Sequence, residues 1–260
     1  MNMKQAGTRL AIVSLMTVLV AACATQSGGS SAKGWNVDEL SKALTASSRP
    51  QADKARDADR KPAQLMTFLG VAPGMTVLDV IAAGGYVTDA LAVAVGPSGK
   101  VYTQNPPGVL RAREGANDKA LTERLANNRL PNVVRVDSDL PAAAIPPGSV
   151  DVAITAMNLH DIYNRDAAAA ATFAKNVYAT LKPGGVFGVI DHMGVVGGEN
   201  AKLHRMPKQA AIDVLKSAGF TLEEESNVLA NPADDHTKGV FDTTLRGKTD
   251  QFVLRLRKPK

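Results

Sequence analysis

The side chains best suited to chemistry follow segments that we predict to be buried strands. The chain has only four histidines, and each one follows such a strand or lies in a connecting segment. His160 and Asp161 come after one apolar run, and Asp191 and His192 end the next. An imidazole beside a carboxylate suits general acid–base catalysis on a hydroxyl group. We therefore predict His160, Asp161 and His192 as catalytic residues. His160 is the first candidate for a general base, with Asp161 or Asp191 orienting it, and His192 is the second candidate.

The same residue types also suit a zinc or iron site, because imidazole and carboxylate groups are ligands of both metals. No two histidines lie at a short ligand spacing such as H-x-x-x-H, so the fold would have to assemble the site. We therefore predict no metal, and a metal-dependent hydrolase or oxygenase is a less favoured alternative. Its candidate ligands are His160, His192, His204, His236, Asp161, Asp191, Asp234 and Asp235.

Apolar runs that alternate with helical segments predict the scaffold for these residues. Strands are predicted over residues 75–80, 100–104, 132–137, 150–156, 186–191, 220–229 and 251–257. Helices are predicted over residues 36–46, 62–70, 86–95, 114–128, 166–181 and 207–219. This alternation predicts an α/β protein with a parallel sheet covered by helices on both faces. Such sheets bind ligands at the carboxyl ends of their strands, near the point where the strand order reverses.

Four segments resemble motifs of the class I S-adenosylmethionine-dependent methyltransferases. In chain order they are VLDVIAAGGYVTDALA, KVYTQN, SVDVAITAMNLHD and LKPGGVFGVIDH, all between residues 65 and 192. Residues 55–62, the segment NLHDIY and residues 231–260 more narrowly resemble an exported subfamily of predicted methyltransferases. The resemblance implies a Rossmann-like doubly wound sheet of seven strands, mostly parallel with one reversed strand, and extra N-terminal helices.

The resemblance also implies S-adenosylmethionine as cofactor and methyl transfer to a small-molecule acceptor. Matched motif by motif, the implied cofactor-binding residues are Asp79, Gly84, Gly85, Gln104, Asn105, Asp137 and Asn158. Gln104 or Asn105 would hold the ribose hydroxyls in place of the family's acid, and Asp137 or Asp139 would hold the adenine amino group.

Two positions of the glycine motif depart from the family's D-x-G-x-G-x-G spacing. Ile81 and Ala83 stand where the first two glycines belong, although the motif's turn passes close under the cofactor and disfavours side chains. This departure supports an alternative, in which the chain is a non-catalytic binding lipoprotein that has kept the fold.

The N-terminus has the pattern of a lipoprotein signal peptide over residues 1–22. Lys4 and Arg9 precede an uncharged apolar run over residues 10–22, which is shorter than the roughly 20 residues that span a bilayer. The only cysteine, Cys23, follows this run and resembles the acylated cysteine of the bacterial lipobox. We predict a lipid anchor at Cys23, a flexible tether over residues 24–35 and one domain over residues 36–260.

Composition limits the partners that the chain could have. The formal net charge is only +5, and the sequence has no basic run with interleaved aromatic residues, so we expect no nucleic acid. We expect contact with the membrane only through the anchor, in the bacterial cell envelope, on the outer membrane and facing the periplasm. Two polar segments have open roles: Arg56, Asp57, Asp59 and Arg60 suit a lid or a solvated helix face, and residues 231–250 suit a binding loop.

Overall fold

The computed structural model describes residues 1–2 and 34–260. Cys23, most of the predicted signal peptide and most of the predicted tether lie outside these residues. Trp35, which the sequence places in the tether, packs on the domain instead, and its indole donates a hydrogen bond of 2.7 Å to the carbonyl of Ala94. Within the described part of the chain, no helix is both long enough and apolar enough to cross a membrane.

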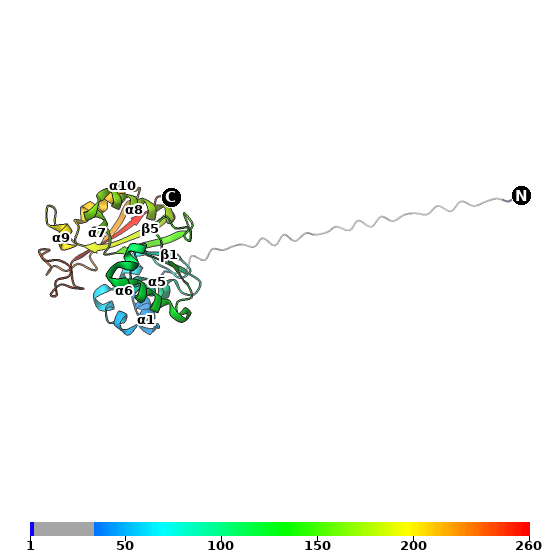
Figure 1. Cartoon of the computed structure of the whole chain (residues 1–260). Coiled ribbons are helices and arrows are strands. Elements are labelled where there is room, and N and C mark those ends of the chain that lie inside the picture. Colours follow the sequence, from blue (N-terminus) through cyan, green and yellow to red (C-terminus); the bar gives the residue numbers. More distant parts are fainter. Residues whose placement is uncertain (3–33) are drawn as a thin grey trace. The chain divides into compact units, whose positions relative to one another are not determined.

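A seven-stranded sheet with the order β3-β2-β1-β4-β5-β7-β6 forms the centre of the domain (Figure 1). Its strands are β1 (Thr76–Val80), β2 (Lys100–Gln104), β3 (Val133–Val136), β4 (Val150–Ala156), β5 (Leu181–His192), β6 (Thr221–Ser226) and β7 (Gln251–Arg257). The first five strands pair in parallel, and β7 runs antiparallel to both β5 and β6. This topology confirms the predicted Rossmann-like sheet with one reversed strand.

Helices cover both faces of the sheet, as predicted (Figure 1). On one face, α8 (Ala167–Thr180) and α10 (Lys208–Ser217) bury aliphatic side chains against the strands. On the other face, α1 (Val37–Ala46), α4 (Pro62–Leu69) and α5 (Tyr86–Val95) form a second apolar core. Helices therefore shield both faces of the sheet from water. The central strands are buried on both sides, which explains their nearly continuous apolar runs.

Shorter elements connect these layers and differ most from the sequence predictions. They are α2 (Gln51–Lys54), α3 (Asp57–Arg60), α6 (Pro107–Leu125), the 3₁₀ turn η1 (Ala126–Asn128), α7 (Leu159–Arg165) and α9 (Asn200–Leu203). The predicted helix over residues 114–128 begins earlier, at Pro107, and its backbone is non-helical from Ala112 to Gly115. The sequence analysis missed α7, which follows β4 directly and carries His160 and Asp161.

A buried ion-pair network fixes α6 against the start of the domain. Asp89 of α5 is fully buried and accepts hydrogen bonds from the guanidinium groups of Arg124 and Arg129, at 2.5 Å and 2.6 Å. Arg124 also pairs with Asp53 of α2 at 2.7 Å and donates to the carbonyl of Gly84 at 2.8 Å. Because a buried carboxylate needs charged partners, these contacts hold the turn after β1 in place.

Candidate functional site

A cavity of about 770 Å³ opens at the carboxyl ends of β1, β4 and β5. Ile81 lines it from the end of β1, Met157 and Asn158 from the end of β4, and His192 from the end of β5. The chain leaves β1 toward β2 on one side and returns to β4 on the other, so the cavity lies at the switch point of the sheet. Its volume is typical of small-molecule sites. The sequence predicted ligand binding at this edge of the sheet, and the cavity lies there.

Asp191 of β5 organises the floor of the cavity. Its side chain is fully buried, and its Oδ1 lies 2.6 Å from Nδ1 of His160. Its two oxygens also accept the backbone N–H groups of His160, at 2.9 Å, and of His192, at 2.8 Å. These contacts join the end of β5 to the first turn of α7 and fix the His160 ring, as the sequence analysis expected of Asp191.

The two histidines on this floor have opposite electrostatic surroundings. Burial opposes a charge on His160, but hydrogen bonds to Asp161 and Asp191 prevail and raise the pKa of His160 to about 9. For His192, burial dominates and lowers the pKa to about 4. The ring centroids are 5.5 Å apart. At neutral pH the site therefore holds a cationic and a neutral imidazole side by side, an arrangement that can separate the roles of acid and base.

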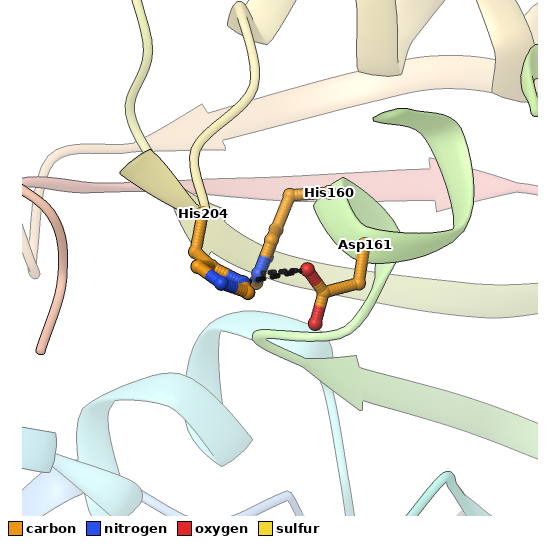
Figure 2. Close-up of side chains that lie close together, drawn as sticks. All are labelled: His160, Asp161 and His204. Carbon is orange, nitrogen blue, oxygen red and sulfur yellow. Dashed lines mark hydrogen bonds and ion pairs between the residues drawn. The ribbon is translucent and has the colours of Figure 1, made fainter. Parts of the chain in front are cut away.

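Asp161 and His204 extend the site beyond His160 (Figure 2). Oδ1 of Asp161 lies 3.3 Å from Nε2 of His160 and 2.8 Å from Nδ1 of His204. Hydrogen bonding to His160 is the largest cause that lowers the pKa of Asp161 to about 2. The three side chains are thus an imidazole–carboxylate–imidazole group, and residue 204 comes from a loop that the sequence analysis could not connect to α7.

The turn after β1 keeps a left-handed backbone at each glycine position of the motif. The φ angles are +57° at Ile81, +49° at Ala83 and +81° at Gly85. A left-handed conformation is unfavourable for a residue with a side chain, especially for β-branched isoleucine. Ile81 and Ala83 line the cavity, whereas an added side chain at Gly85 would meet Arg124 and Leu121 of α6. Gly84 and Gly85 therefore allow close packing of α6. The sequence predicted them as cofactor-binding residues, but neither lines the cavity.

Gln104 and Asn105 support this turn and do not line the cavity. Gln104 accepts the N–H of Ile81 at 3.2 Å and donates to the carbonyl of Ser138 at 2.6 Å. Asn105 accepts the N–H of Ala83 at 2.8 Å and donates to its carbonyl at 3.1 Å. Both side chains are buried. Their predicted role toward a ribose is therefore replaced by a structural one, since their amide groups already hold the strained backbone.

The other predicted cofactor-binding residues divide between the core, the surface and the cavity. Asp79 is buried, accepts the hydroxyl of Thr88 at 2.6 Å, and has a pKa that burial raises to about 6. Asp137 lies outside the cavity and pairs with Arg135 at 2.8 Å. Asn158 does line the cavity, and its amide nitrogen donates to the carbonyls of Ile81 and Ala156. Of the seven residues, Asn158 alone is thus placed to contact a ligand there.

Two segments with open roles contribute to the cavity wall. Arg56, Asp59 and Arg60 line it, as the lid interpretation expected, and Val240, Phe241 and Arg246 line it from the loop over residues 231–250. The sequence analysis missed Tyr86, whose ring lies under the guanidinium groups of Arg56, at 4.7 Å, and Arg60, at 5.2 Å. In the sequence, only the position of Tyr86 directly after the glycine motif indicated that it could belong to the site.

The remaining candidate metal ligands have partners elsewhere. His236 pairs with Asp250 at 2.9 Å, and Asp234 pairs with the fully buried Arg205 at 2.9 Å. Nδ1 of His192 lies 2.7 Å from the hydroxyl of Thr249. Of the eight candidate ligands, His160, Asp161 and His204 thus place one ligand atom each close to the other two, and Asp191 contacts the second ring nitrogen of His160.

Replacing Asn105 with alanine tests whether its side chain holds the turn. Asn105→Ala removes two hydrogen bonds and leaves the N–H of Ala83 without this acceptor, so we expect a loss of about 1–3 kcal/mol in the free energy of unfolding. Urea denaturation measures the loss. Asn227→Ala, at an exposed position, is the matched control and should change stability by less than about 0.5 kcal/mol. Equal stability of the two variants would contradict the supporting role.

Comparison with known proteins identifies the fold. No family model and no curated protein matches the chain. Among solved structures, it is similar to an S-adenosylmethionine-dependent methyltransferase from Aquifex aeolicus, with 19% identity, a TM-score of 0.59 and coverage of 86% of this chain and 99% of that one. It is also similar to the 4+2 cyclase SpnF, with 16% identity, a TM-score of 0.57 and coverage of 86% and 92%. The chain therefore has the class I methyltransferase fold.

Proposed function

We propose that this chain transfers a methyl group from S-adenosylmethionine to a small-molecule acceptor. The observation that carries the proposal is the cavity at the switch point, formed beside a turn that is left-handed at residues 81, 83 and 85. The turn is thus left-handed at all three positions where the family's motif has glycine, although two of its residues are not glycine. The Aquifex methyltransferase, which shares the fold, is described as dependent on this cofactor.

The cavity offers groups that suit the cofactor. Its ribose hydroxyls and ammonium group are hydrogen-bond donors, and Asp59 and Asn158 place acceptor oxygens on the lining. The amide nitrogen of Asn158 is engaged with backbone carbonyls, which leaves its oxygen for a ligand. These residues would hold the cofactor in place of Gln104, Asn105 and Asp137. When bound, the cofactor supplies an electrophilic methyl group on its sulfonium, and placing a nucleophile in line with it can supply much of the rate.

His192 is better placed than His160 to act as the general base. Both ring nitrogens of His160 have carboxylate partners, Asp191 and Asp161, so this ring is not open to an acceptor. His192 lines the cavity, and Thr249 engages only its Nδ1. Nε2 of His192 is therefore the nitrogen that would take the proton from an acceptor hydroxyl or amine. His160 and Asp191 act as positioning residues that fix the floor beside it.

The charge of the cavity favours an acceptor that carries an acidic group. Arginine side chains outnumber carboxylates on the lining, which includes Arg56, Arg60, Arg113 and Arg246 against Asp59 and Asp161. Arg60 is half-buried, and its guanidinium hydrogen-bonds to no other residue in the described part of the chain. A guanidinium in such a position suits a carboxylate or phosphate group, which it can bind through two hydrogen bonds.

A non-catalytic binding lipoprotein is the second candidate function. Ile81 and Ala83 place side chains where the family's motif has none, and the amide groups expected to hold the ribose support the turn instead. The cavity and its arginines would then bind an anionic small molecule without any cofactor.

Calorimetric titration of the purified full chain distinguishes the two functions. We expect S-adenosylmethionine and S-adenosylhomocysteine to bind with a Kd of about 1 μM, or about −8 kcal/mol. Asn158→Ala should weaken binding about tenfold, because one hydrogen bond to the ligand is lost, whereas the control Asn227→Ala should bind like the parent chain. If millimolar ligand gives no binding heat, the methyltransferase proposal is wrong and the binding function stands.

We also propose that the protein is anchored through an acylated Cys23 and faces the periplasm. The sequence pattern before Cys23 supports this location. Labelled palmitate supplied to expressing bacteria should enter the protein, and Cys23→Ser should abolish the labelling because the acylated thiol is gone. Unchanged labelling of Cys23→Ser, or no labelling of the parent chain, would contradict the anchor.

A further inference from the structure

Three potential metal ligands lie close together, and two of them, His160 and Asp161, line the cavity (Figure 2). His160 and Asp161 lie in the first turn of α7, and His204 follows α9, more than forty residues later in the chain. One ligand atom from each side chain lies within 4.8 Å of the other two. Among residues 34–260, no other group of three histidine, cysteine or acidic side chains meets this condition.

We infer that His160, Asp161 and His204 bind a divalent transition-metal ion of the zinc type. Zinc binds histidine nitrogen and aspartate oxygen at about 2.0–2.2 Å, so neighbouring ligand atoms of a tetrahedral site lie about 3.3 Å apart. Here Oδ1 of Asp161 is 3.3 Å from Nε2 of His160 and 2.8 Å from Nδ1 of His204. Small side-chain movements would therefore complete the coordination geometry.

A carboxylate outside the three ligands orients the first histidine. Oδ1 of Asp191 lies 2.6 Å from Nδ1 of His160, which leaves Nε2 facing Asp161. Histidine ligands of metals almost always donate their second ring N–H to a carboxylate, a carbonyl or a water in this way. The buried Asp191 therefore accepts the Nδ1 proton and fixes the direction of Nε2, whose own proton would leave when the metal binds.

The loop that carries His204 is fixed independently of any metal. Its neighbour Arg205 is fully buried and donates to the carbonyls of Met193, at 2.9 Å, and Lys238, at 3.0 Å, while also pairing with Asp234. Asn164 of α7 donates to the carbonyl of Arg205 at 2.8 Å. The two segments that bear the ligands are thus connected by direct hydrogen bonds, and these hold His204 next to Asp161 before any metal binds.

The site would keep an open coordination position next to the cavity. Three protein ligands leave at least one position of a tetrahedral ion for water or a ligand. His160 and Asp161 both line the cavity, and the side chains of Asp161 and His204 are 59% and 38% exposed, so an ion can enter from solvent. The open position would accept an oxygen anion, such as a carboxylate of the bound small molecule. This inference is independent of the proposed methyl transfer.

Metal titration of the full chain, freed of metal with a chelator, tests the inference. We expect one Zn²⁺ or Co²⁺ per chain and no competition from Mg²⁺, which prefers all-oxygen sites. Asp191→Asn should weaken binding about 10- to 100-fold, as the loss of an outer-shell partner does. His204→Gln and Asp161→Asn should weaken it at least as much. His236→Gln, which alters a histidine paired with an aspartate outside the cluster, is the matched control and should bind like the parent chain.

Three results would overturn the inference. They are less than stoichiometric binding by the parent chain, full binding by His204→Gln, or equal weakening by His236→Gln. Circular dichroism checks that each variant is folded, and the exposure of His204 makes its replacement tolerable. X-ray absorption of the zinc-loaded parent chain provides a second measurement: imidazole and oxygen ligands alone are expected, and a sulfur ligand would place the ion on Cys23 and contradict the site.

Discussion

The buried carboxylate of Asp191 is the interaction on which the candidate site depends. A fully buried carboxylate is costly unless hydrogen bonds and a positive partner compensate it. Asp191 obtains both from its surroundings, because two backbone N–H groups and the His160 ring surround its oxygens. The same contacts join β5 to α7, set the direction of His160 and bring Asp161 to the cavity. His192 lies beside this arrangement, and its own burial keeps the ring neutral, so two neighbouring histidines have different chemical properties.

A second constraint, at the turn after β1, shows how the fold tolerates an altered motif. Left-handed backbone at Ile81 and Ala83 costs energy that glycine would avoid. Gln104 and Asn105 offset the cost, because their amide groups bond the backbone of these two residues. Gln104 and Asn105, which the resemblance implies as ligand-binding residues, thus have a structural role. The wall that remains for ligands is apolar near the turn and rich in arginine around it.

The sequence predicted the sheet and most helices, because apolar runs separated by glycine and proline leave few alternative folds, and the resemblance to the methyltransferases implied the reversed strand. The sequence did not predict α7, because seven residues with a polar face give little helical periodicity. It also did not predict the first half of α6, which begins at two prolines. As predicted, His160 follows β4, and Asp191 and His192 end β5, while their catalytic roles stay predictions. The partners of Gln104 and Asn105 were not predictable, because they depend on the path of the turn that these side chains support. His204 was not predictable either, since only the folded loop brings it to Asp161.

Long-range ¹H–¹⁵N NMR of the histidine rings tests the central role of Asp191 most directly. The measurement uses the labelled full chain, freed of metal, over a pH range from about 4 to 10. At about pH 7.5 both His160 nitrogens should carry protons, and one of these two protons should leave only near pH 9. His192 should stay neutral until the pH falls to about 4. If His160 is neutral at about pH 7.5 and titrates near the ordinary value of about 6.5, the carboxylates of Asp161 and Asp191 do not hold the ring charged and the account is wrong.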